Sequence, residues 1–386
     1  FSKNKKISVC LLLLLITIVG CSRISSAQGW SGVLVDDNRL VLASMDGHVM
    51  VLDKNTGKHI WKPDLMRVNE EDENKRAAYG LPAVSNGIIF VGVYDGKIQA
   101  IEVDTGRIVE TEVVSDDFEI VGGPLIHENN LYIGSSDGIL RSYDLDFSNQ
   151  QVTFVDDWSY KVDGEIWSTP VIHDDTLIIT SLDHYVYALN KDTGELLWKT
   201  ETGGAVAATP VIEEDTVFVG SFDGVFYAFD LHTGVEEWVF EKASNWYWGG
   251  AVIEGQTIYI PSLDGKLYAL DVRSGKKKWE LETNGAIVGS PAIVSDMIVV
   301  GSTDGEIRIA ETSSGEVLAS CDVGDSIQSP ITSDGFEIYF SVRDHSVRAL
   351  TVKANGNPDE KWDAPYFSNL LKDDKNPQPS DWSPDC

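Results

Sequence analysis

Eight aspartates recur along this chain at nearly constant intervals, and carboxylates in such a series could bind metal ions or transfer protons. Each of them follows one short apolar run and opens another, and six are followed by glycine. An Asp-Gly pair supplies the positive φ angles that a two-residue hairpin requires, so the series predicts eight hairpin turns rather than eight catalytic groups. The intervals are 49, 42, 46, 40, 41, 40 and 40 residues, and the aspartates are Asp46, Asp95, Asp137, Asp183, Asp223, Asp264, Asp304 and Asp344.

The other reactive side chains do not form the patterns that metal or redox chemistry requires. The seven histidines are spread along the chain without the close spacing of zinc ligands. A Ca²⁺ site needs several oxygen ligands that converge on one point, and no Asp-rich loop with that spacing is present. We therefore expect no catalytic residue and no metal site.

The balance of charge limits the partners of the protein. Lys and Arg number 30 against 61 Asp and Glu, which gives a formal net charge of −31. A polyanion is repelled by such a surface, so nucleic acid is excluded as a partner.

The N-terminal segment has the features of an export signal. Lys3, Lys5 and Lys6 precede an apolar run from Ile7 to Gly20, which is too short to span a bilayer. The ending Ile18-Val19-Gly20-Cys21 resembles the lipobox of bacterial lipoproteins. That resemblance implies a signal peptide over residues 1–20, lipidation of Cys21 and a tether over residues 21–30. The alternative is an ordinary secretory signal with an incidental cysteine.

Two of the four cysteines lie beyond the signal and the lipobox, namely Cys321 and Cys386. An exported protein meets an oxidising environment, where these two residues could form a disulfide. Two separate thiols are the alternative, because the sequence does not show whether their Cα atoms come within about 7 Å.

A repeat of about 40 residues accounts for most of the chain. One copy reads Ser181-Leu182-Asp183-His184-Tyr185-Val186-Tyr187-Ala188-Leu189-Asn190 and then Thr193-Gly194-Glu195-Leu196-Leu197-Trp198. Each copy contains three apolar stretches of strand length, with a fourth upstream after a proline. Four antiparallel strands per unit and eight units predict an all-β, eight-bladed β-propeller over residues 31–364. An acidic tail rich in Pro and Asp follows over residues 365–386.

Tryptophans recur on the fourth stretch of the repeat. A large ring there can cover the adjoining blade, and a small residue such as Ala188 would leave room for it. The second and seventh units carry Glu110 and Ala319 instead, so we expect weaker contacts between blades there. The predicted docking residues are Trp61, Trp158, Trp198, Trp238, Trp279 and Trp362.

This pattern resembles the PQQ-like β-propeller repeat family. That family includes quinoprotein dehydrogenases, which hold a quinone between a tryptophan and a disulfide of adjacent cysteines, with Ca²⁺ nearby. It also includes non-enzymatic lipoproteins such as the BamB branch of outer-membrane protein assembly factors. No two cysteines are adjacent in this chain. The resemblance therefore favours the lipoprotein branch, and neither PQQ nor another cofactor is expected.

Irregular loops are the best candidates for a binding surface, because loops carry function on a rigid scaffold. The long charged stretch from Asp64 to Gly80 offers Arg67 and Arg76, and the stretch from Ser115 to Val121 offers Phe118. Arg343 is a further candidate, with an internal ion pair to Asp344 as the alternative.

The most distinctive loop carries Trp246, Tyr247 and Trp248, and Trp167 begins the equivalent loop of the fourth unit. Aromatic side chains dominate both carbohydrate platforms and protein hot spots. These rings either contact a ligand or plug the axial channel.

The sequence thus favours a lipid-anchored, non-enzymatic scaffold of the cell envelope, which holds an envelope protein on its loop-rich face and touches the membrane only through its lipid. In a two-membrane cell we expect it on the outer membrane facing the periplasm, and otherwise on the outer cell surface. The alternatives are a quinone-dependent dehydrogenase and a binder of glycans or small ligands.

Overall fold

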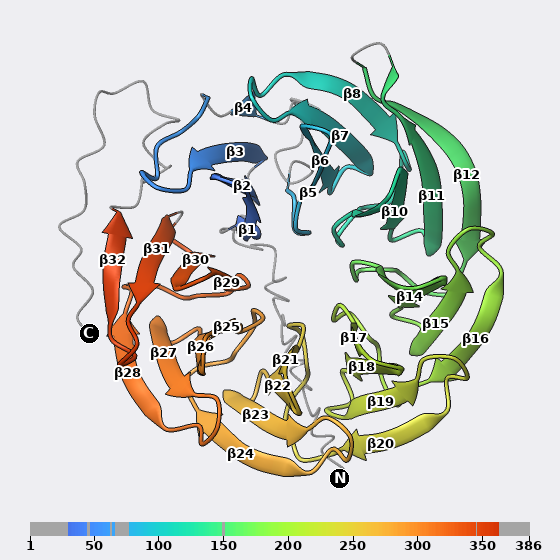
Figure 1. The fold of residues 1–386 in the computed structure, drawn as a ribbon. Coiled ribbons are helices and arrows are strands. Elements are labelled where there is room, and N and C mark those ends of the chain that lie inside the picture. The colour runs from blue at the N-terminus through green and yellow to red at the C-terminus, as the bar shows by residue number, and fades with distance from the viewer. Residues whose placement is uncertain are drawn as a thin grey trace, which may run out of the picture.

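The protein is a ring of eight four-stranded antiparallel sheets around a central axis (Figure 1). The computed structural model describes residues 30–44, 47–61, 64–65, 77–148, 151–344 and 346–362. Within these ranges the predicted all-β, eight-bladed propeller is confirmed. The described ranges contain no helix with the length and apolar character needed to cross a bilayer. The segments 1–29 and 363–386, which include Cys21 and Cys386, lie outside these ranges, and so do Arg67 and Arg76.

Each blade is made of four strands that follow one another in the chain. The first four blades consist of β1 (Trp30–Asp36), β2 (Arg39–Ser44), β3 (His48–Asp53) and β4 (Asp64–Leu65); β5 (Ala83–Ser85), β6 (Ile88–Val93), β7 (Lys97–Glu102) and β8 (Ile108–Val113); β9 (Leu125–His127), β10 (Asn130–Gly134), β11 (Ile139–Asp146) and β12 (Thr153–Lys161); β13 (Val171–His173), β14 (Thr176–Thr180), β15 (Tyr185–Asn190) and β16 (Leu196–Glu201).

The same order continues through the second half of the ring. These blades consist of β17 (Val211–Glu213), β18 (Thr216–Gly220), β19 (Phe226–Asp230) and β20 (Glu236–Phe240); β21 (Val252–Glu254), β22 (Thr257–Pro261), β23 (Lys266–Asp271) and β24 (Lys277–Glu282); β25 (Ala292–Val294), β26 (Met297–Gly301), β27 (Glu306–Glu311) and β28 (Val317–Asp322); β29 (Thr332–Asp334), β30 (Glu337–Ser341), β31 (Val347–Val352) and β32 (Pro358–Trp362).

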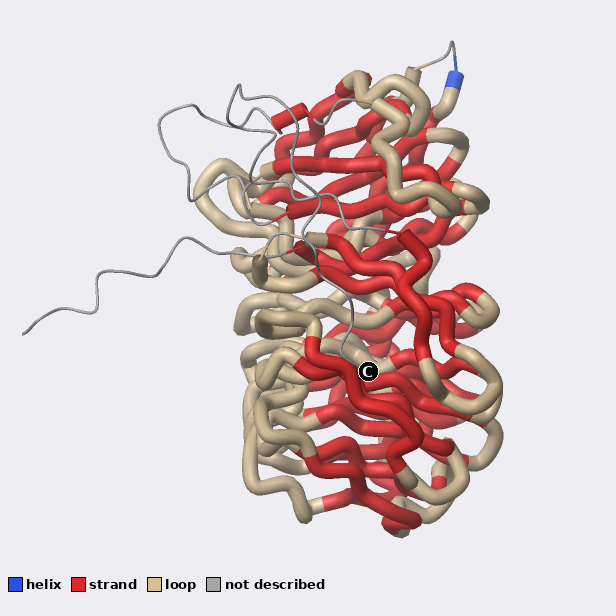
Figure 2. The backbone as a smooth tube through the Cα atoms, turned by 90° about the vertical axis from the view of Figure 1, so that its left-hand side faces the viewer, coloured by secondary structure: helices blue, strands red, loops and turns tan. Residues whose placement is uncertain are grey.

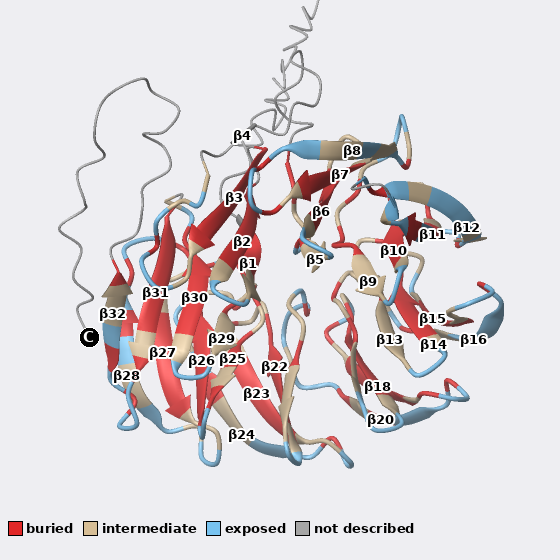
Figure 3. Ribbon diagram, turned by 45° about the horizontal axis from the view of Figure 1, so that its top comes forward, coloured by how far each residue is buried: buried red, intermediate tan, exposed pale blue. Residues whose placement is uncertain are grey.

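The middle strands of each blade are buried on both faces, because a neighbouring blade packs on each side. In β14, Leu177, Ile178 and Ile179 are all fully buried. The outermost strands, by contrast, are largely exposed along the rim (Figure 3). Seen from the side, the strands form a short cylinder whose loops emerge at its two ends (Figure 2). The apolar core is thus divided among the eight contacts between blades.

Five tryptophans on outermost strands, together with Trp61 just before β4, seal six of these contacts. Trp198 of β16 is 8% exposed, and its indole N–H donates to the carbonyl of Leu231 in the next blade at 2.7 Å. Trp61, Trp158, Trp238, Trp279 and Trp362 donate in the same way, at 2.8–3.0 Å, to the carbonyls of Val103, Lys191, Val272, Thr312 and Lys54. Within its own blade, Trp198 lies opposite Ala188, which leaves room for the indole.

Each indole rests on a glycine in the turn between the third and fourth strands of the next blade. Gly234 has a φ of +68°, which disfavours any residue with a side chain. A Cβ atom added to Gly234 would lie 2.5 Å from Cε3 of Trp198. The Thr-Gly and Ser-Gly pairs of the repeat are therefore required both for the turn and for the docking of the indole.

Two contacts between blades lack an indole, as the sequence indicates. Where Glu110 takes the tryptophan position, Phe147 and Phe154 of the third blade pack against Phe90 with ring centroids 6.5 and 5.9 Å apart. Next to Ala319, Leu318 takes the place of the indole and lies against Gly356 of the eighth blade. Apolar packing replaces the indole in both places, but the indole hydrogen bond is missing.

The ring closes without any exchange of strands between its ends. The first and last blades are each built from consecutive strands, β1 to β4 and β29 to β32. The indole of Trp362 donates to Lys54 at 3.0 Å, Lys54 pairs with Asp334, and the hydroxyl of Thr332 donates to the carbonyl of Val33 at 2.6 Å. The first and last blades are therefore joined by the same kind of indole contact that joins neighbouring blades elsewhere in the ring.

Cys321 lies in β28 with no exposed surface, and its sulfur is disulfide-bonded. The other three cysteines of the chain lie outside the described residues. The pairing of Cys321 with Cys386 therefore stays a prediction.

Replacing Trp198 by Ala tests the docking contact. We expect the free energy of unfolding to fall by about 3–5 kcal/mol, the usual cost of truncating a buried tryptophan. Urea unfolding followed by circular dichroism provides the measurement. The control is Leu197→Ala, since that neighbouring side chain is 51% exposed and its loss should change stability by less than about 0.5 kcal/mol. If both variants lowered the free energy of unfolding by the same amount, the role of the indole in joining the blades would be contradicted.

Candidate functional site

Within the described residues, the hairpin turns with the recurring aspartates and the loops that cross from an outermost strand to the next innermost strand lie at one end of the ring. We call this end the aspartate face. The antiparallel order of each blade puts these two kinds of connection at the same end and the other two turns at the opposite end. The aspartate face thus combines the residues that the sequence marks as candidates.

The recurring aspartates form internal contacts. In three blades a tyrosine hydroxyl donates to the carboxylate of the aspartate four residues before it, as Tyr187 does to Asp183 at 2.7 Å and Tyr227 to Asp223 at 2.6 Å. Burial and this contact raise the pKa of Tyr227 to about 12. In three other blades an arginine takes the tyrosine position, in the pairs Arg141–Asp137, Arg308–Asp304 and Arg348–Asp344.

The same carboxylates also hold the crossing loops. Asp183 accepts a hydrogen bond from the backbone N–H of Asp163 at 3.1 Å, and Asp304 accepts one from Asn284 at 2.9 Å. Asp264 does the same for the N–H of Ser244 at 3.0 Å, so in these three blades the turn carboxylate fastens the loop that enters its own blade. The repeated aspartates are structural, as their Asp-Gly context predicts.

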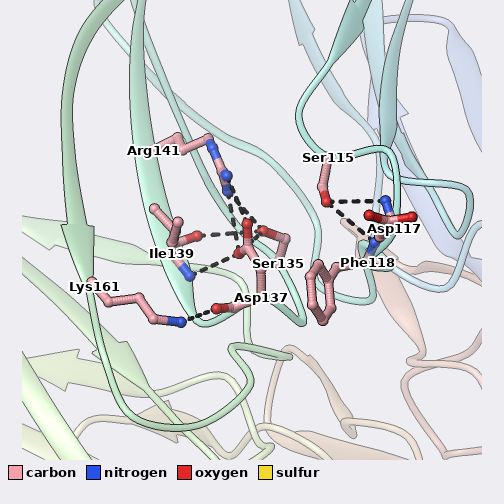
Figure 4. A network of polar contacts seen from close by, with 8 residues as sticks. All are labelled: Ser115, Asp117, Phe118, Ser135, Asp137, Ile139, Arg141 and Lys161. Atoms are coloured by element: carbon pink, nitrogen blue, oxygen red, sulfur yellow. Dashed lines mark hydrogen bonds and ion pairs between the residues drawn. The ribbon is translucent and has the colours of Figure 1, made fainter.

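Figure 4 shows the contacts that Asp137 makes in the third blade. Asp137 accepts hydrogen bonds from the Ser135 hydroxyl at 2.5 Å and the Ile139 N–H at 2.9 Å, and pairs with Arg141 at 2.6 Å. Lys161 donates to the backbone carbonyl of Asp137. Burial alone would raise the pKa of Asp137, but the hydrogen bonds outweigh burial and hold this pKa below its ordinary value.

The aromatic loop presents two of its three rings to solvent. Trp246 is 49% exposed and Trp248 is 40% exposed. Both rings stack on Phe222, with centroids 4.9 and 5.6 Å away and interplanar angles of 13° and 16°. Trp167 approaches Trp248 with a centroid distance of 6.4 Å. The half-exposed indoles favour a contact surface over a buried plug, and sequence reasoning missed Phe222.

Tyr247 does not belong to this surface, so its assignment as a contact residue is wrong. Its side chain has no exposed area and lies against Gly220 and Phe226. In an extended loop successive side chains point to opposite sides, so Tyr247 faces inward between Trp246 and Trp248. The equivalent position, five residues before each innermost strand, is buried in the other described crossing loops too: Ala78, Ile120, Ile166, Val206, Ile287 and Ile327.

Trp167 is half-buried, and its indole N–H donates to the hydroxyl of Ser136 at 3.2 Å. Ser136 lies in the run Gly134-Ser135-Ser136-Asp137-Gly138, which has the Gly-x-Ser-x-Gly spacing of a hydrolase nucleophile. That motif requires a strand followed by a helix, whereas Ser136 lies in the turn between β10 and β11. The spacing is a by-product of the repeat.

Phe118 and Arg343 are both exposed on the aspartate face. Phe118 is 48% exposed in the loop held by the Ser115 hydroxyl, which accepts a hydrogen bond from its N–H at 3.2 Å (Figure 4). Asp344 pairs with Arg348 at 3.2 Å rather than with Arg343. Arg67 and Arg76 lie outside the described residues.

The sequence lacks the adjacent cysteines that clamp the quinone in the dehydrogenases of the PQQ-like repeat family. Within the described ranges no group of three or more His, Cys, Asp or Glu side chains is arranged to hold a metal ion.

The repeat, the docked indoles and the eight blades define a β-propeller of the PQQ-like class. Comparison with known families places it further: residues 31–352 match the family described as the β-propeller of the beta-alanine-activating enzyme, and the chain belongs to this family.

The similar sequences are assembly factors, and the structures with the same fold include an assembly factor and an enzyme. The outer membrane protein assembly factor BamB of Legionella pneumophila (strain Paris) is 27% identical over 180 residues, which cover 44% of this chain and 42% of that protein. The chain thus spans less than half of this relative. The structure of BamB from Moraxella catarrhalis superposes with a TM-score of 0.68 at 20% identity, over 83% of this chain and 94% of that one. A quinohemoprotein alcohol dehydrogenase, ADHIIG from Pseudomonas putida HK5, reaches 0.67 at 16% identity, over 83% and 69%.

Replacing Asp137 by Asn tests the contacts of the turn carboxylate through their pH dependence. Because the folded state lowers the pKa of Asp137, its charged form stabilises the fold above the ordinary value of 3.8, and this contribution is lost as the pH falls through the lower folded value. The variant should therefore be less stable than the parent at pH 7 and should lose less stability on acidification. Urea unfolding at pH 7 and pH 3 measures both effects. Asp116→Asn, in the exposed part of the preceding loop, is the control; an identical pH dependence in parent and Asp137→Asn would refute the assignment.

Proposed function

We propose that this protein is a non-enzymatic scaffold of the cell envelope that holds a protein partner on its aspartate face. The observation that carries this proposal is the exposed aromatic cluster of Trp246, Trp248 and Phe222, on a face whose recurring carboxylates are occupied by internal contacts. Exposed aromatic groups on a rigid scaffold are typical of protein interaction sites. The similarity to BamB, an outer membrane protein assembly factor, supports the same class of function.

Attachment to the envelope is part of this proposal. The lipobox resemblance makes Cys21 the lipidated residue, with residues 21–30 as the tether to the ring. In this proposal the lipid holds the protein at the membrane and the aspartate face binds the partner. The membrane contact is through the lipid alone.

The fold does not choose between the scaffold and a quinoprotein enzyme, because BamB and the alcohol dehydrogenase superpose almost equally well. The absence of the cysteine clamp from the sequence favours the scaffold.

Photo-crosslinking in intact cells tests the proposal. The residue p-benzoylphenylalanine is placed at Phe118, on the aspartate face, or at Phe336, which is 53% exposed in the turn between β29 and β30 at the opposite end. We expect the Phe118 position to form an adduct that contains an outer-membrane assembly protein, identified by mass spectrometry. The Phe336 position should not. No protein adduct at Phe118, or the same adduct at both positions, would contradict a partner on the aspartate face.

A further inference from the structure

The crossing loops set which side chains surround the mouth of the axial channel. Since the fifth residue before each innermost strand from β5 onward is buried, the fourth residue points the other way, toward the aspartate face, and so does the sixth except in the loops where it is the buried Ala77 or Ser326. The fourth residues alternate in size around the ring. Blades two, four and six present Tyr79, Trp167 and Trp248, whereas blades three, five and seven present Val121, Ala207 and Val288.

This alternation brings distant aromatic rings together. Trp167 and Trp248 belong to loops that enter blades four and six, and the small Ala207 of the blade between them leaves space for the indoles to approach within 6.4 Å. Phe222, next to the turn aspartate of blade five, extends the cluster to Trp246. The result is a continuous apolar surface over three blades.

Carboxylates continue this surface toward blades two to four. The sixth positions there hold Glu119 and Glu165. Burial raises the pKa of Tyr94, and the negative charges of Glu119 and Glu165 contribute to the same shift. Tyr79 and Tyr94 pack edge to face with centroids 5.4 Å apart. Among the residues that the structure describes, no cation pairs with either glutamate.

We call the residues Tyr94, Glu119, Glu165, Trp167, Trp246 and Trp248 the mouth arc. The arc is one-sided, because blades seven and eight present Thr303, Gln328 and the exposed Arg343 at the corresponding positions. A surface that combines indoles and unpaired carboxylates attracts cations both through the ring faces and through charge. The net charge of −31 adds a field of the same sign.

We propose that the mouth arc is the docking site for a segment of the partner protein that carries Arg or Lys side chains beside an apolar residue. This inference rests on the proposed function and names the chemistry of the partner. The apolar residue contacts the indoles of Trp167 and Trp248, and the cationic groups pair with Glu119 and Glu165. An acidic segment or a neutral polymer makes neither ionic contact.

Peptide binding to the full-length, detergent-solubilised protein tests the inference. The probe is a fluorescein-labelled peptide of repeated Gly-Arg-Leu-Arg, and the comparison peptide is repeated Gly-Glu-Leu-Glu; fluorescence anisotropy reports binding. We expect only the basic peptide to bind. The double variants Trp246→Ala with Trp248→Ala, and Glu119→Gln with Glu165→Gln, should each weaken its binding by about tenfold or more.

Matched variants at the opposite end of the ring separate docking from general attraction to an acidic protein. Phe336→Ala removes an equally exposed aromatic ring, and Glu128→Gln with Glu213→Gln removes two exposed carboxylates from turns of that end. These variants should bind the basic peptide as the parent does. An equal loss in arc and control variants, or no loss in the arc variants, overturns the docking site.

The two proposals fail in different ways. If the arc variants bind the peptide normally while the Phe118 crosslink to an assembly protein persists, the scaffold function stands and the mouth arc is not its docking site. If no partner is captured on the aspartate face, the scaffold function itself fails, whatever the peptide does.

Discussion

The contact between an indole on one blade and a glycine turn on the next is the interaction on which this ring depends. It satisfies the indole N–H with a backbone carbonyl, covers the apolar face of the turn and leaves no space for a side chain on the glycine. Because the contact recurs between Trp362 and the first blade, the ring closes without a strand shared between its ends. Each blade is thereby held only by its neighbours, and the middle strands are apolar on both faces for that reason.

A second set of contacts, at the aspartate face, determines which side chains of the crossing loops can contact a partner. Turn carboxylates such as Asp183 and Asp304 hold their crossing loops, and a loop residue such as Ile166 or Tyr247 is inserted between blades against a glycine. The residues on either side of this buried residue are not packed between blades, so their types can differ from blade to blade. The aromatic and acidic character of the mouth arc is concentrated at these positions.

Much of the fold follows from the sequence, because the signals are local and repeated. The Asp-Gly turns, the Thr-Gly turns and the tryptophans at a fixed offset predict both the blades and the docking contacts. Tyr247 is an exception. Its place between two tryptophans predicts a residue of the contact surface, whereas the structure buries its side chain. The apolar residues Ile120, Ile166 and Val206 at the same offset are the signal that would have placed Tyr247 inside.

The rest of the site depends on the closed geometry of the ring. Trp167 and Trp248 meet only because a ring brings the entrances of blades four and six around one axis, with a small Ala207 between them. Phe222 sits in a repeat position that is Leu182 or Thr303 in other blades, so no local pattern marks it. The packing of Leu318 on Gly356 in place of an indole likewise becomes visible only in the structure.

Native-state hydrogen exchange measured by mass spectrometry in low concentrations of urea tests the central role of the docked indoles most directly. The account predicts that the amides of β8 and β28, which carry Glu110 and Ala319 at the indole position, exchange through openings of lower free energy than those of β16 and β24, which carry Trp198 and Trp279. Equal protection of all four outermost strands, or greater protection of β8 and β28, would contradict it.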